Sequence, residues 1–171
     1  MLRITDVMKN PFQIVKLSMN ARPAIEAVVA ALKKAGVEGV LIGNAAAALH
    51  GAPVTTDDFD IMFRDTRVNV MKLQIMAHEL QGSVVQPHYP LSKMYRIIGK
   101  DGIQVDMMGD IDGIKSFESL RSRAIPMTFA EGKLYVSSLE DVIKSKKAAN
   151  RKKDKAVLSI LEATLREKKK A

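Results

Sequence analysis

The stretch "GNAAAALHGAPVTTDDFDIMF", residues 43–63, decides the fold, because it links two short apolar segments through an acidic turn. Residues 38–43 form a short apolar strand that ends in glycine, and residues 58–63 form the next expected strand. Between them, the alanine-rich segment predicts a short helix with Asn44 at its N-cap and Gly51 at its end. A strand, a short helix and a second strand are therefore expected around a cluster of aspartates.

Further along the chain, apolar residues recur at helical spacing. This periodicity predicts amphipathic helices over residues 22–36, 67–82, 138–150 and 153–170. The positions expected to face inward are Ile25, Val28, Val29 and Leu32 in the first helix, Val68, Met71, Ile75 and Leu80 in the second, and Val157, Ile160, Leu161 and Leu165 in the last. The third helix opens with a capping box from Ser138 to Asp141.

Two hairpins are expected in the second half of the chain. Residues 93–109 contain two apolar strands around the turn at residues 100–102, and residues 125–137 form another pair around Glu131 and Gly132. Helices and strands are intermixed, with a crossover early and hairpins late. We therefore expect an α+β fold in which helices flank a mixed β-sheet, with a helical pair at the C-terminus.

The length and charge of the chain restrict its organisation. Its 171 residues suit one domain over residues 1–171, with a helical or irregular lead-in over 1–22 and basic helices over 138–171. Residues 144–171 hold 11 Lys and Arg against 3 Asp and Glu, whereas residues 1–143 hold 16 of each, so the net charge of +8 lies in the tail. Such a tail can attract RNA or nucleotide phosphates, but a solvated helix that keeps the protein soluble explains it equally well.

Several classes of function lack the residues that they need. The sequence has no cysteine, which excludes disulfides, thiolate metal sites and a cysteine nucleophile, and which suits a reducing cytoplasm. No apolar run reaches transmembrane length and the N-terminus lacks a signal-peptide pattern, so a cytoplasmic protein without a membrane partner is expected. Neither a Gly-x-Ser-x-Gly elbow, nor a Walker A motif, nor zinc-ligand spacing occurs.

The aspartates at the start of the second strand are the main candidates for chemistry. Strand side chains alternate, so Asp58 and Asp60 point to one face, about 7 Å apart along the strand. Such charges repel each other unless a cation lies between them, and hard divalent cations such as Mg2+ bind oxygen ligands in this way. Asp106 stands between Val105 and Met107 in another apolar strand, where an unpaired charge is costly. If the two strands are neighbours, the three carboxylates can hold one or two metal ions.

Other interpretations of these aspartates stay open. Asp57 and Asp58 can cap or turn an acidic loop, and Asp106 can pair with an arginine such as Arg96 on a neighbouring strand. The residues before them favour a metal site, because a strand ending in Gly43 and leading into a helix makes a turn whose backbone N–H groups can cradle phosphates. A phosphate cradle followed by a metal-binding acidic pair is what transfer of a nucleotide from a triphosphate requires.

These elements resemble the nucleotidyltransferase superfamily of DNA polymerase beta. The family pattern is Gly followed by Gly or Ser, a spacer, Asp-x-Asp between apolar residues, and a third Asp on a later strand. Here it corresponds to residues 42–44, 13 intervening residues, residues 58–61, and residues 105–107. More closely, His50-Gly51 and residues 56–60 resemble the signature of the small bacterial and archaeal branch that includes AbiE-type toxin nucleotidyltransferases.

A late segment extends the resemblance. "SLEDVIKSKKAANRKKD", residues 138–154, is similar to a motif of the same branch, and the resemblance covers about residues 38–161. The catalytic and metal-binding set that it implies, for Mg2+ or Mn2+, is Asp58, Asp60 and Asp106. The set that it implies for binding a nucleoside triphosphate is Gly43, Asn44, Thr56 and Lys146. His50 falls in the last turn of a helix, where we expect it to satisfy terminal carbonyls.

The resemblance implies a Mg2+-dependent enzyme that moves a nucleoside monophosphate from a nucleoside triphosphate to a hydroxyl of RNA, such as tRNA, or of a protein. A toxin–antitoxin partner and an oligomer fit this setting. Two residues depart from the pattern: Asn44 replaces the second Gly or Ser, and Val54 replaces an arginine. They motivate the alternative of a catalytically silent fold that binds nucleotide, RNA or a partner protein.

Overall fold

The computed structural model describes residues 21–87 and 89–170, so the expected lead-in lies outside the described residues except for its last two positions. The elements in chain order are α2 (Ala21–Ala35), β1 (Gly39–Leu41), α3 (Gly43–Leu49), β2 (Phe59–Phe63), α4 (Arg67–Glu79), β3 (Ser83–Val85), β4 (Tyr95–Ile98), a 3-10 turn (Lys100–Gly102), β5 (Gln104–Met108), α5 (Phe117–Arg123), β6 (Ile125–Phe129), β7 (Gly132–Val136), α6 (Leu139–Ala149) and α7 (Lys152–Lys170).

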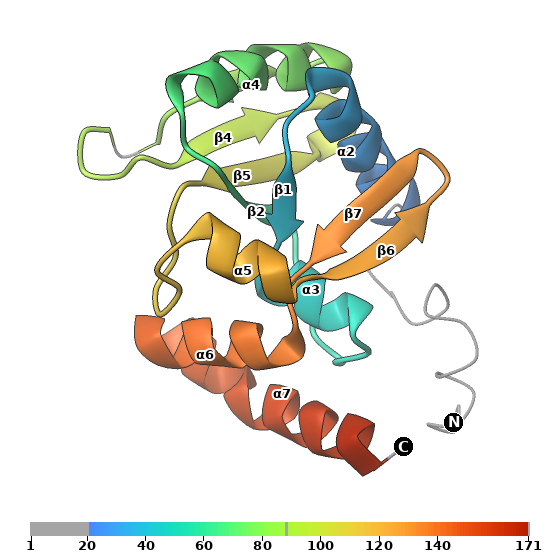
Figure 1. The fold of residues 1–171 in the computed structure, drawn as a ribbon, viewed down its shortest axis with the longest axis vertical. Helices are drawn as coiled ribbons and strands as arrows, with labels where there is room; N and C mark the ends of the chain where they lie inside the picture. Colours follow the sequence, from blue (N-terminus) through green and yellow to red (C-terminus); the bar gives the residue numbers. More distant parts are fainter. Residues whose placement is uncertain (1–20, 88, 171) are drawn as a thin grey trace.

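The described strands form one seven-stranded sheet in the order β3-β4-β5-β2-β1-β7-β6. β1 runs parallel to β7 and β2 runs parallel to β5, whereas the other neighbouring pairs are antiparallel. Both expected hairpins are confirmed, as β4–β5 and β6–β7. The predicted α+β class, a mixed sheet flanked by helices with α6 and α7 at the C-terminal end, is therefore confirmed (Figure 1).

The two faces of the sheet carry different helices. Leu41 and Ile61 belong to the larger apolar core, to which α2 and α4 contribute. Val40 and Met62 point the other way and pack in a smaller cluster with Phe117 of α5. Because strand side chains alternate, Asp60 lies on the same face of β2 as Met62, which is the face that α5 covers.

Helix α4 presents a different face to the core from the one expected. Val68, Met71 and Ile75 are 63%, 67% and 47% exposed, so their inward placement is wrong, whereas Leu80 is buried as expected. The residues of α4 that are buried are Leu73, Met76 and Ala77. Two apolar stripes run along this helix at helical spacing, and the spacing alone does not say which of them faces α2 and the sheet.

The other helices follow the sequence more closely. The four inward positions expected for α2 are all buried, and Ser138 caps α6 by accepting from the Asp141 N–H, as the capping box predicts. In α7, Leu161 is buried but Ile160 is 36% exposed, which contradicts its expected inward position. The short elements α5 and β3 were not predicted. No helix among the described residues has the length and apolarity needed to cross a membrane.

Candidate active site

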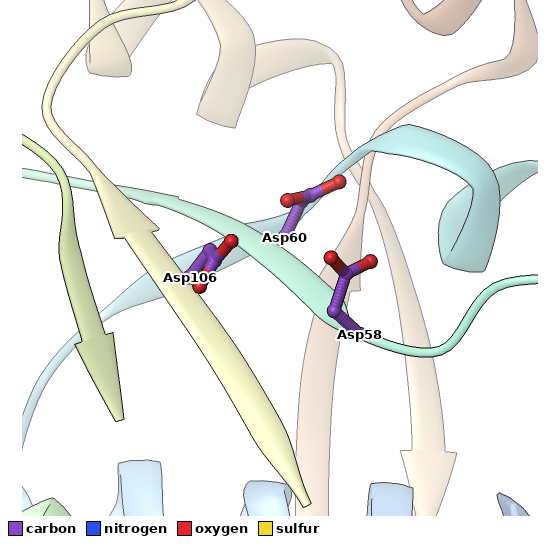
Figure 2. Close-up of side chains that lie close together, drawn as sticks. All are labelled: Asp58, Asp60 and Asp106. Atoms are coloured by element: carbon purple, nitrogen blue, oxygen red, sulfur yellow. The ribbon is translucent and has the colours of Figure 1, made fainter. Parts of the chain in front are cut away.

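The three candidate carboxylates meet near the start of β2. Asp60 is paired in register with Asp106 of the parallel strand β5, and Asp58 directly precedes β2. One carboxylate oxygen from each residue lies within 4.8 Å of the others, and Figure 2 shows the side chains gathered on one side of the two strands. Ligand oxygens on opposite sides of a Mg2+ ion lie about 4 Å apart, since each bond measures about 2.0–2.1 Å. Three carboxylate oxygens within 4.8 Å of one another are candidate ligands for a hard divalent cation.

The carboxyl group of Asp60 lacks a directly paired cation in the described part of the chain. Among residues 21–87 and 89–170, no side chain forms a hydrogen bond or an ion pair with it. Burial raises the pKa of Asp60 to about 6, and the carboxylates of Asp58 and Asp106 act in the same direction. Lys153 and Lys146 act in the opposite direction without cancelling the rise. A divalent cation at this position would supply the missing positive charge.

Asp106 does have a partner within the chain. Arg96 Nε donates to Asp106 Oδ1 at 2.7 Å and Arg96 Nη2 donates to Asp106 Oδ2 at 2.7 Å, from the directly opposite position on β4. The arginine pairing left open from the sequence is therefore confirmed. The ion pair with Arg96 does not exclude metal binding by Asp106. Each carboxylate oxygen has two lone pairs, and the hydrogen bond from Arg96 uses only one of them.

Asp58 is oriented by its own loop. The Thr56 hydroxyl lies 2.9 Å from the Asp58 carbonyl oxygen and 3.1 Å from Asp58 Oδ1, so its single proton is shared between these two acceptors. Thr56 also lines the pocket. Its visible contacts are with Asp58, which makes it a support for a carboxylate.

Gly43 leaves the room that Asp60 occupies. Its φ of +67° lies in the left-handed region, and a Cβ built on it would lie 2.6 Å from Asp60 Oδ2. Any larger residue here would be strained and would displace the carboxylate. The glycine of the predicted phosphate turn is therefore also the residue that lets Asp60 approach the end of β1.

Asn44 does not cap α3 as expected. The helix begins at Gly43, so the N-cap position falls two residues before Asn44, on Ile42, and has no side-chain cap. Asn44 Nδ2 instead donates to the Thr55 carbonyl oxygen at 3.1 Å, and Asn44 Oδ1 is buried without a hydrogen-bond partner. The side chain therefore ties the start of α3 to the loop that carries Thr56 and Asp58.

Basic side chains from the C-terminal helices and from the linker between them complete the pocket, whose volume is about 1020 Å³. The lining includes Lys146, Arg151 and Lys153 together with the three carboxylates. Lys146 Nζ and Arg151 Nε hold the buried Asp154 at 3.2 and 2.6 Å. Lys153 makes no such pair within the described part of the chain, so its charge is available to a ligand.

His50 has a structural position. It is buried, and its Nε2 lies 2.7 Å from the Ser137 carbonyl oxygen, which can only accept, so Nε2 carries the proton. Lys168 then donates to His50 Nδ1 at 3.3 Å. Burial lowers the pKa of His50. The residue does satisfy a carbonyl, but one at the junction of β7 and α6 instead of one in its own helix.

Some pocket residues had no role in the site predicted from the sequence. Arg151 and Lys153 were identified only as matching positions of the C-terminal motif, and Arg96 was expected only as a partner of Asp106. Lys115, in the loop between β5 and α5, also lines the pocket. Nothing in its neighbourhood marks it in the sequence, because a lone lysine in a polar loop is ordinary.

The class of protein to which this fold belongs follows from a match to a family of nucleotidyltransferases. Residues 21–171 match the family described as "Nucleotidyl transferase of unknown function (DUF2204)", and the chain belongs to that family. No curated protein matches the chain.

Solved structures of similar fold include two of the antibiotic-resistance factor ANT(2″)-Ia. Its solution structure has a TM-score of 0.58 at 16% identity, over 87% of this chain and 86% of that one. Its crystal structure in complex with adenylyl-2″-tobramycin has a TM-score of 0.56 at 16% identity, over 86% and 90%. An antigenic nucleotidyltransferase-like protein from Paracoccidioides brasiliensis has a TM-score of 0.49 at 15% identity, over 86% and 77%. At these identities, the first two matches show a shared fold.

Proposed function

We propose that this protein is a metal-dependent nucleotidyltransferase that moves a nucleoside monophosphate from a nucleoside triphosphate to a hydroxyl group. The observation that carries the proposal is the meeting of Asp58, Asp60 and Asp106 within 4.8 Å, in a pocket that Lys146 and Lys153 also line. Carboxylates bind cations and lysines bind phosphates, so the pocket contains groups suited to both the metal and the phosphates of a metal–triphosphate complex.

In this proposal, Asp58 and Asp60 hold Mg2+ or Mn2+, and Asp106 completes the site. The bound ion would neutralise triphosphate oxygens and polarise the α-phosphorus. The acceptor oxygen bonds to the α-phosphorus, the bond to the departing pyrophosphate breaks, and a carboxylate of the cluster takes the hydroxyl proton. Lys153 and the backbone N–H groups at the start of α3 bind the phosphates, and Lys146 does so with the N–H donors that its bond to Asp154 leaves over.

The acceptor in this proposal is a hydroxyl of RNA, such as tRNA, or of a protein. The basic C-terminal tail, with 11 Lys and Arg against 3 Asp and Glu over residues 144–171, supports the RNA acceptor. The adenylyl-2″-tobramycin bound to ANT(2″)-Ia supports a hydroxyl acceptor and an adenylyl donor in general. We place the protein in the cytoplasm as a single domain over residues 1–171, in a toxin–antitoxin pair of the AbiE type, with a partner protein or a second copy helping to bind the acceptor.

A second candidate is a catalytically silent member of the fold that binds nucleotide, RNA or a partner protein and transfers no nucleotide. The Asn44 side chain favours it, because Nδ2 is hydrogen-bonded to the Thr55 carbonyl and Oδ1 would repel a phosphate. Val54, where the family pattern has an arginine, packs against the apolar core and offers no charge. These residues weaken triphosphate binding in the first proposal without touching the carboxylates.

The test is pyrophosphate release from each of the four ribonucleoside triphosphates, with Mg2+, with Mn2+ and with a chelator, in the presence of tRNA or protein acceptors. We expect metal-dependent release that is lost in Asp58→Ala and Asp60→Ala. Asp101→Ala, which removes a carboxylate from the exposed β4–β5 turn, is the matched control and keeps full release. Triphosphate binding without release, unchanged by a chelator, would favour the silent fold.

A further inference from the structure

One row of side chains crosses three neighbouring strands on the face of the sheet that carries the acidic cluster. Asp60 of β2 stands opposite Asp106 of β5, and Asp106 stands opposite Arg96 of β4. The Asp106 side chain is 5% exposed and the Arg96 side chain is 29% exposed. The guanidinium group therefore meets the carboxylate cluster from the side of β4 and is itself largely covered.

The hydrogen bonds between Arg96 and Asp106 fix an orientation as well as a charge. Two parallel N–H donors at 2.7 Å each hold the two oxygens of Asp106, so the carboxylate plane cannot turn without losing one of them. Lysine could not do this, because an ammonium group is a point charge without the planar pair of donors.

The charges of the row matter as much as its geometry. Counted without the nearby Lys146 and Lys153, the carboxylates of Asp58, Asp60 and Asp106 carry three negative charges when ionised and Arg96 brings one positive charge, so these four groups have a net charge of −2. One divalent ion balances that net charge. Without Arg96 the same three carboxylates would attract divalent ions more strongly, because the positive guanidinium group repels a metal ion bound beside it.

We propose that Arg96 is the positioning residue of this site: it orients Asp106 for the transfer step and limits the affinity of the metal-free protein for divalent ions. The inference rests on the metal-dependent function proposed above. It predicts that loss of Arg96 changes two measurable properties in opposite directions. Metal affinity rises because the competing charge is gone, and turnover falls because Asp106 is no longer held in one orientation.

The experiment measures the dissociation constant for Mn2+ without nucleotide, by calorimetry, in the whole protein and in Arg96→Met. We expect Mn2+ to bind about tenfold more tightly to Arg96→Met, and turnover with saturating Mn2+ to fall by about tenfold to a hundredfold. The matched control is Arg121→Met. Arg121 has a 28% exposed side chain, is paired with Glu38 and does not line the pocket, so its loss leaves the dissociation constant unchanged.

Arg96→Lys separates charge from geometry and serves also if Arg96→Met does not fold. It keeps the positive charge, so Mn2+ binds as in the wild type, but kcat falls while KM for the triphosphate stays the same. A joint loss of Mn2+ affinity and turnover in Arg96→Met, or full turnover in Arg96→Lys, overturns the inference. A wild-type protein that binds no Mn2+ overturns the proposed function instead, so the two failures are distinguishable.

Discussion

Asp60 and Asp154 line the same pocket and are treated by the chain in opposite ways. Asp154 is 1% exposed, and although its burial acts to raise its pKa, hydrogen bonds from Arg151 and Lys146 hold the pKa of that carboxyl below its ordinary value. Asp60 receives no such bonds from the described residues, and burial together with Asp58 and Asp106 raises its pKa to about 6.

The two acids therefore differ in their partners: the described residues supply cationic partners to Asp154 and none that is directly paired with Asp60. Asp154 joins the end of α6 to the start of α7 and thereby fixes the basic wall of the pocket. Asp60 stores unfavourable electrostatic energy in the metal-free protein, which a bound cation would relieve. Mutation can test this contrast, because removal of the Asp154 charge should lower the stability of the metal-free protein and removal of the Asp60 charge should raise it.

The largest effect is expected for Asp154→Ala. The change leaves Lys146, whose side chain is 12% exposed, without its partner, and breaking a buried pair in this way costs about 3–5 kcal/mol. Urea unfolding without metal measures it. Glu162→Ala is the control, since it breaks an exposed pair with Lys147 and should cost less than about 1 kcal/mol. Equal stabilities of the two variants would show that Asp154 is not the anchor described.

Asp60→Asn should instead stabilise the metal-free protein. Asparagine has nearly the same shape but no charge, so the variant avoids the repulsion and desolvation that raise the pKa of Asp60. A pKa raised by about two units corresponds to about 2–3 kcal/mol, and we expect a gain of about 2 kcal/mol at pH 8. Urea unfolding in the presence of a chelator measures the gain. A loss of stability would mean that a cation within the chain already pairs with Asp60.

The same shift predicts a pH dependence with a defined sign. The folded-state pKa of Asp60, about 6, lies above its ordinary value of 3.8, so the folded protein binds more protons between these pH values. The contribution of Asp60 to stability is therefore fully present below about pH 4 and is lost as pH rises through about 6. The free energy of unfolding of the wild type, minus that of Asp60→Asn, should therefore fall by about 2 kcal/mol from pH 4.5 to pH 8. A difference that is constant with pH contradicts the raised pKa.

The smallest effect is expected for Arg151→Gln. Asp154 keeps its bond to Lys146, and the Arg151 side chain is 59% exposed, so water replaces much of what is lost. We expect a loss of at most about 1 kcal/mol in urea unfolding. If Arg151→Gln were as costly as Asp154→Ala, the buried charge would depend on Arg151 more than on Lys146.

Much of the site follows from local rules of sequence. Strand alternation places Asp58 and Asp60 on one face, and an acid between apolar residues marks Asp106. That β2 and β5 are neighbours could only be supposed, because parallel pairing joins segments distant in sequence and leaves no local signal. The sequence supplied the residues, and the sheet order decided that they meet.

The misplaced residues share a physical cause, which is that local pattern does not determine tertiary neighbours. In α4, the stripe with Met71 and the stripe with Met76 are equally periodic, and packing against α2 selects the second. Asn44 suits an N-cap by residue type, but the N-cap position of α3 lies two residues earlier, at Ile42, and the Asn44 amide donates to the Thr55 carbonyl oxygen. The bidentate pair of Arg96 and Asp106 was foreseeable only as one of several alternatives, because its register depends on the β4–β5 turn.

The most direct test of the central claim, that the acidic cluster binds a metal together with a triphosphate, is a thermal-shift titration. Each of the four ribonucleoside triphosphates is added with and without Mg2+ to the wild type and to the double variant Asp58→Ala, Asp60→Ala. The account predicts a Mg2+-dependent stabilisation of the wild type, about 2.7 kcal/mol at 100 times the dissociation constant, that is absent from the double variant. An equal shift in both proteins, or no shift in the wild type with any triphosphate, would contradict it.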